Sequence, residues 1–63
     1  MYKYTVTAEA PDLERTQRFQ VIAPNVDRAW ARAYYECNSI SANSGNYWTP
    51  TDVIKSKEEQ DEN

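Results

Sequence analysis

Hydrophobic and polar residues alternate near the start of the chain and again shortly before its middle. Between Tyr2 and Ala8 every second residue is apolar, and the same period returns from Thr16 to Ala23. Alternation with a period of two is typical of strands that bury one face. Residues 9–15 contain proline and aspartate and indicate a connecting loop. The pattern therefore predicts an antiparallel hairpin.

A helical pattern follows the second predicted strand directly. Pro24 should end that strand because proline has no backbone N–H for the ladder, and Asn25 is a favoured residue at a helix N-cap. Apolar residues then recur at helical spacing as far as Cys37. Residues 38–46 are rich in Asn and Ser and contain the only glycine, which is typical of a long loop. The sequence predicts one helix that ends near Cys37.

Residues 47–55 have the composition of a third strand, with Tyr, Trp, Val and Ile among them. Pro50 cannot donate to a sheet ladder, so this strand should be interrupted or lie at an edge. The elements together predict an α+β fold of the type ββαβ, with one helix packed on a small antiparallel three-stranded sheet. This single domain is expected to occupy residues 1–55, followed by a disordered acidic tail over residues 56–63.

The predicted helix has two faces that differ in chemistry. The face expected to pack on the sheet comprises Val26, Ala29, Trp30, Ala33, Tyr34 and Cys37. A cysteine on such a stripe is expected to behave as a small buried hydrophobic residue rather than as a nucleophile. Arg28, Arg32 and Tyr35 lie on the opposite side. Arginine and tyrosine are favoured at binding hot spots, so this face is a candidate partner-binding surface. The alternative is a solubilising face on which Arg32 pairs with Glu36.

Other aromatic residues divide in the same way between core and surface. Tyr2, Tyr4 and Phe19 could in principle stack on bases, but so small a domain needs these rings for its core. Tyr47 and Trp48 follow the predicted loop and are expected to be exposed. They therefore join the helix residues in the predicted partner-binding set.

Few residues in the chain could carry chemistry. With 63 residues, no histidine and one cysteine, the chain cannot build a His/Cys zinc site or a Ser-His-Asp triad. Its single glycine cannot form a glycine-rich phosphate loop. We therefore expect no catalytic residue, no metal ion and no cofactor, and a protein that is not an enzyme.

The charge distribution favours a protein partner over nucleic acid. The net charge is −3, and discounting the carboxylates of Glu58, Glu59, Asp61 and Glu62 leaves about +1. Binding through phosphates normally needs a clear excess of Lys and Arg. The acidic tail is expected to be a solvated end, and imitation of phosphate charge is the alternative. A small nucleic-acid-binding regulator is the runner-up function, and it would use Lys3, Arg15, Arg18, Arg28 and Arg32.

Cellular location and assembly can also be inferred from the residues. One cysteine allows no internal disulfide, and the chain has no apolar run of about 18 residues. We expect a cytoplasmic protein that makes no membrane contact. A homodimer formed through the exposed edge of the last strand is compatible with so small a sheet.

Residues 19–33 carry a resemblance to known proteins. The predicted strand ends in Ala23, and Asp27 stands two positions before helical Ala29, with Ala33 four positions later. Over about half of the chain, this pattern resembles small phage-encoded inhibitors of the ββαβ type. Two groups of such inhibitors show a similar pattern: the podovirus inhibitor of bacterial RNA polymerase, and certain anti-CRISPR proteins that block the guide-RNA complex. The resemblance implies a non-enzymatic protein that occludes a working surface of a host nucleic-acid-handling complex in the host cytoplasm.

Overall fold

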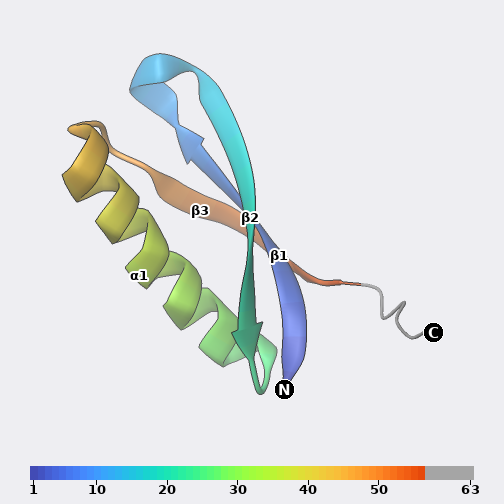
Figure 1. Ribbon diagram of the computed structural model, residues 1–63. Coiled ribbons are helices and arrows are strands. Elements are labelled where there is room, and N and C mark those ends of the chain that lie inside the picture. Colours follow the sequence, from blue (N-terminus) through green and yellow to red (C-terminus); the bar gives the residue numbers. More distant parts are fainter. Residues whose placement is uncertain (57–63) are drawn as a thin grey trace.

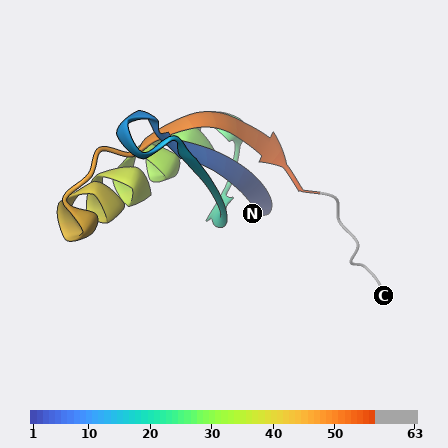
Figure 2. The ribbon, with the colours of Figure 1, turned by 90° about the horizontal axis from the view of Figure 1, so that it is seen from above.

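One helix packs against one face of a three-stranded antiparallel sheet. The computed structural model describes residues 1–56. Its elements are β1 (Tyr2–Ala10), the short 3-10 helix η1 (Pro11–Leu13), β2 (Arg15–Ala23), α1 (Val26–Ser44) and β3 (Thr49–Lys55). The strand order is β2-β1-β3, so β1 is the central strand. Figures 1 and 2 show α1 along one side of the twisted sheet. The predicted α+β fold of type ββαβ is confirmed.

The hairpin of β1 and β2 is longer than the sequence pattern predicts. Its pairing runs from Tyr2 opposite Ala23 to Ala10 opposite Arg15, so residues 9, 10 and 15 of the expected loop belong to strands. The turn closes tightly because Glu14 adopts a left-handed conformation with φ of 52°, and its N–H donates to the carbonyl of Pro11. Ala10 stays in the strand because its side chain is fully buried in the core.

The third strand lies at an edge of the sheet, as its proline predicts. It begins at Thr49 rather than at residue 47 and pairs only with β1. Pro50 stands opposite Ala8, next to an irregularity in the register between Thr7 and Ala8. The pairing continues past the strand, because the Ser56 N–H donates to the Lys3 carbonyl at 2.8 Å. The expected acidic tail begins at Ser56, and its residues 57–63 lie outside the described residues.

The start of the helix agrees with the prediction, and its end does not. Asn25 is the N-cap, and its Oδ1 accepts from the Arg28 backbone N–H at 2.9 Å. The helix continues past Cys37 to Ser44, and Gly45 ends it with φ of 77°, a conformation that glycine adopts without strain. Asn and Ser lower helix propensity by only a few tenths of a kcal/mol each. Packing of Ile40 against the core outweighs that deficit.

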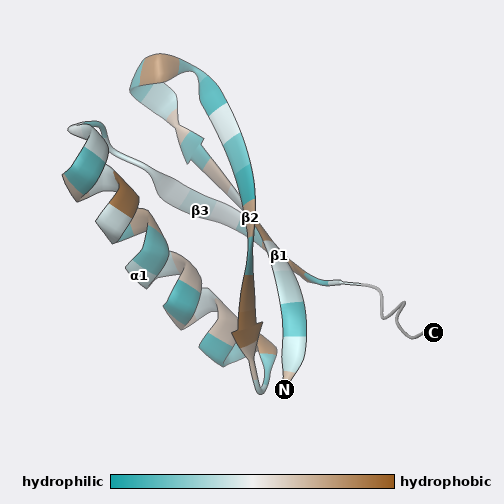
Figure 3. Cartoon of the chain, viewed as in Figure 1, coloured by the Kyte–Doolittle hydropathy of each residue, from teal (hydrophilic) through white to brown (hydrophobic). Residues whose placement is uncertain are grey.

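The core is arranged in two adjoining clusters, in which small side chains outnumber large rings. The first contains Tyr4, Val6, Val21, Ala23, Ala29, Ala33 and Val53, and the second contains Ala8, Ala10, Cys37 and Trp48. Phe19, which is half-buried, packs against both clusters. Figure 3 shows the hydrophobic end of β2 where the chain turns into the helix. Close contact between α1 and the sheet therefore depends on alanine and cysteine rather than on large rings.

The helix buries a narrower stripe than the sequence predicts. Ala29, Ala33 and Cys37 are buried as expected, and Trp30 is half-buried against the first cluster. Val26 and Tyr34 were expected on the same stripe, but both are exposed, Tyr34 to 53%. Tyr34 is about 100° from Ala33 around the helix axis, so its ring points sideways once Ala33 faces the sheet.

Candidate functional site

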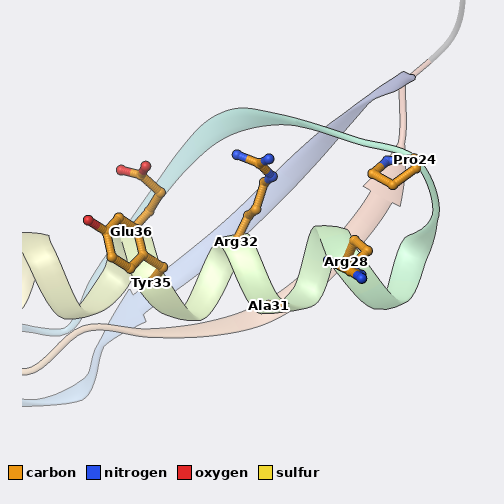
Figure 4. A pocket seen from close by; sticks show the side chains of 6 residues that line it. All are labelled: Pro24, Arg28, Ala31, Arg32, Tyr35 and Glu36. Carbon is orange, nitrogen blue, oxygen red and sulfur yellow. The ribbon is translucent and has the colours of Figure 1, made fainter.

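The predicted outer helix face forms one side of a shallow surface pocket. Its volume is about 320 Å³, and it is lined by Pro24, Arg28, Ala31, Arg32, Tyr35 and Glu36. Figure 4 shows these side chains along successive turns of α1, with Arg28 near Pro24 at the start of the helix. The structure therefore brings the predicted set of Arg28, Arg32 and Tyr35 together.

Local structure explains why these side chains share one place. Positions 28, 32 and 35 are four and three residues apart, which places their side chains on one side of a helix. Pro24 ends β2, and the Asn25 cap fixes where the first helical turn begins. Ala31 also lines the pocket, and it adds only a methyl group to this surface.

The pocket combines positive charge with flat, solvent-exposed surface. Tyr35 is 70% exposed, the largest exposure of any tyrosine in residues 1–56, and both arginines are exposed. Glu36 lies one turn after Arg32 and adds one carboxylate to the lining of the pocket. Guanidinium groups donate hydrogen bonds in a planar fork that fits carboxylates, and they stack on aromatic rings. The arrangement can bind acidic and aromatic groups of a partner.

The other predicted binding residues do not belong to this pocket. Tyr47 is exposed to 61%, as expected, but Trp48 is only 7% exposed and was wrongly predicted to be at the surface. The Trp48 N–H donates to Ser41 Oγ at 2.8 Å, and the Ser41 hydroxyl donates to the Trp48 carbonyl at 3.4 Å. These two hydrogen bonds connect Trp48 to the helical turns that follow Cys37, and the Trp48 ring lies in the same core cluster as Cys37.

An aromatic strip on the helix was missed from the sequence. The Trp30 and Tyr34 rings lie 6.1 Å apart between centroids, with Tyr34 exposed and Trp30 half-buried. Two helix residues that are four positions apart differ in direction by about 40° around the axis. A row of residues with this spacing therefore moves gradually away from the buried stripe. The spacing of Val26, Trp30 and Tyr34 could have indicated this drift. These residues give the helix a second exposed flank, apolar rather than basic.

The cations of the runner-up function are not gathered on one surface. Lys3 and Arg18 alternate with the inward-facing Tyr4 and Phe19, so they lie on the sheet face opposite the helix. Arg28 and Arg32 lie on the outer side of the helix. A phosphate backbone that followed one of these surfaces would leave the other cations uncontacted.

Cys37 is buried on the sheet side of α1, with 1% of its surface exposed. Burial raises the pKa of its thiol above the ordinary value, and the nearby Glu36 carboxylate raises it further. Since the thiolate is the reactive form, we expect iodoacetamide to modify Cys37 more than about tenfold more slowly in the folded chain than in guanidinium-unfolded chain. Mass spectrometry of timed samples measures both rates. Equal rates at the same pH would contradict the burial of this thiol.

Metal-ligand clusters and membrane-spanning helices are both absent from residues 1–56. No three His, Cys, Asp or Glu side chains come close enough together there to hold a metal ion. No helix in this part of the chain combines the length and the apolar character needed to cross a membrane. Comparison of the chain with protein families, with curated proteins and with solved structures found no match in any of the three.

Proposed function

We propose that this chain is a non-enzymatic protein-binding module whose contact surface is the outer side of α1. The observation that carries the proposal is the pocket that Arg28, Arg32 and Tyr35 line while remaining exposed. Interface hot spots are enriched in Trp, Tyr and Arg, because these side chains offer large contact area and directed hydrogen bonds. The exposed Tyr34 extends this surface along the apolar flank of the same helix.

The same surface suits an acidic partner. Arg28 and Arg32 each carry a charge that the protein itself does not bury, and a partner carboxylate could approach either guanidinium from solvent. Tyr35, three residues after Arg32, supplies a ring against which an aliphatic or aromatic side chain of the partner could pack. We therefore propose a protein partner that presents acidic and aromatic residues together.

The biological role that we propose is inhibition. The resemblance of residues 19–33 to small phage-encoded inhibitors supports a phage or mobile-element protein that occludes a host nucleic-acid-handling complex, either a CRISPR effector or an RNA polymerase. The helix face supports it because a rigid helix with exposed Arg and Tyr can cover a partner surface without catalysis. Direct binding of nucleic acid is the competing function, and the experiment below separates the two.

Charge reversal tests the proposed surface. We expect the double variant Arg28→Glu/Arg32→Glu to lose capture of a bacterial protein complex that the unmodified chain retains from lysate. The expected loss of affinity is at least about a hundredfold, because two hot-spot side chains are replaced by repelling ones. Pull-down followed by quantitative mass spectrometry identifies the complex, and calorimetry with the purified complex measures the affinity.

The matched control is Arg15→Glu/Arg18→Glu, which changes the charge equally on β2. This control should retain the partner, because neither of its arginines lines the pocket. Equal loss in both double variants would show that general charge, rather than the helix face, governs binding. Capture that disappears after nuclease treatment, with DNA or RNA binding that weakens steeply with salt, would replace this proposal by the nucleic-acid function.

A further inference from the structure

The two edges of the sheet differ in how well they are protected against further pairing. β3 carries Pro50, which has no N–H, and an irregular register beside it. The Lys55 ammonium lies 3.7 Å from the Tyr2 ring centroid at the other end of the same edge strand. β2 is longer, contains no proline, and pairs regularly with β1 along its whole length. Edges without such protection are templates for pairing with another strand.

The direction of the hydrogen bonds shows which groups on β2 are free to pair. The Lys3 carbonyl accepts from Ser56 and the Thr7 carbonyl accepts from the Thr51 hydroxyl, so odd-numbered β1 residues direct their backbone groups toward β3. Even-numbered β1 residues then face β2 and pair with odd-numbered β2 residues. On β2, the backbone groups that point away from the sheet therefore belong to Thr16, Arg18, Gln20 and Ile22.

These groups are self-complementary about a two-fold axis through Phe19. An antiparallel second β2 centred there places Arg18 opposite Gln20 and Thr16 opposite Ile22, so every outward N–H and C=O finds a partner. Sliding the second strand toward the hairpin turn places Arg18 opposite Arg18, which opposes like charges. Sliding it the other way places Thr16 opposite Pro24, which lacks an N–H. Of these three registers, only the one centred on Phe19 avoids both defects, and it pairs all four outward-facing residues of β2.

The side chains agree with this register. Phe19 is the one large apolar residue of β2 that its own helix covers only in part, and it meets its own copy at the centre. A directly opposed aromatic pair stabilises antiparallel strands. Ile22, which is exposed on the other sheet face, lies against the uncharged Thr16 of the second strand. No charged side chain stands opposite one of like sign.

We propose that two copies of this chain pair antiparallel through β2, centred on Phe19, to form one continuous sheet. A second copy is favoured over an extended segment of another protein because the sequence of β2 itself selects the register. The proposal does not depend on the function inferred for the helix face. It also differs from the dimer that the sequence suggested, since β3, the expected edge, is the one interrupted by proline.

Charge at position 20 tests the interface within the full chain. Gln20 is exposed, so its replacement should leave the monomer folded, as circular dichroism can verify. In the dimer each residue 20 faces Arg18 of the other copy. We expect Gln20→Lys to raise the dimer dissociation constant about tenfold, through repulsion at both symmetric positions, and Gln20→Glu to lower it. Sedimentation velocity over a range of protein concentrations gives the three constants.

Hydrogen exchange locates the interface independently. The backbone amides of Thr16, Arg18, Gln20 and Ile22 should become protected as protein concentration rises, while those of β3 should not change. A chain that sediments as a monomer up to millimolar concentration would overturn the proposal and leave the β2 edge to another protein. A dimer whose stability changes equally in Gln20→Lys and Gln20→Glu, or whose β2 amides stay unprotected, would also overturn it.

Discussion

Replacing Trp48 with alanine should lower the free energy of unfolding by about 3–5 kcal/mol, the range found when large buried aromatic residues are removed. A chain of 63 residues has only about 3–9 kcal/mol of stability in total. The Trp48 ring is the largest side chain of its cluster and covers Ala8, Ala10 and Cys37. Without it, the tip of the hairpin and the last turns of α1 lose their common contact, so we expect much of the population to be unfolded.

The neighbouring residue provides the matched control. Tyr47→Ala also removes an aromatic ring, but from a side chain that is 61% exposed, so stability should change by less than about 1 kcal/mol. Urea titration monitored by circular dichroism measures both variants. Similar losses for Trp48→Ala and Tyr47→Ala would show that the two rings are not divided between core and surface as the structure places them.

Replacing Ala33 with leucine should destabilise the fold by about 1–3 kcal/mol through overpacking. Ala33 is fully buried where α1 crosses the sheet, in the same cluster as Val6 and Val53. Its methyl group sets how closely the helix approaches the strands. A larger side chain there must push α1 outward or adopt a strained rotamer, and the surrounding small residues offer no space for it.

Ala31→Leu is the control because Ala31 is exposed on the outer side of the same helix. Alanine and leucine have similar helix propensities, so this variant should change the free energy of unfolding by less than about 0.5 kcal/mol. Thermal unfolding followed by circular dichroism compares the two variants directly. If Ala33→Leu were as stable as Ala31→Leu, the close contact between helix and sheet would be contradicted.

The predicted binding set has two parts, the helix residues and the pair Tyr47 and Trp48. The structure brings the helix residues together at one pocket but buries Trp48. Arg28, Arg32 and Tyr35 could be grouped from spacing alone, since a helix repeats about every 3.6 residues whatever surrounds it. The exposure of Tyr47 and the burial of Trp48 could not be predicted in this way, because the position where the preceding helix ends decides which ring turns inward. That end lies at Ser44, where Ser41 can hold the Trp48 backbone, and not near Cys37.

The exposure of Tyr34 has a similar cause. On the sequence alone, Trp30 and Tyr34 are the largest side chains on their side of the helix and should face the core. The sheet instead meets the alanines, because backbone layers pack more closely over small side chains. The rotation of α1 about its axis is therefore set by which face fits the strands, and the larger rings are displaced to the flank.

The sequence by itself determined several local features: the alternation in β1 and β2, the Asn25 cap, the stop at Pro24 and the shared side of Arg28, Arg32 and Tyr35. Each depends on residues close together in the chain. The tertiary structure alone decided the length of α1, the burial of Trp48, the exposure of Tyr34 and the central place of β1. These depend on contacts between distant segments, where packing of a whole face outweighs the few tenths of a kcal/mol by which individual residues favour helix or loop.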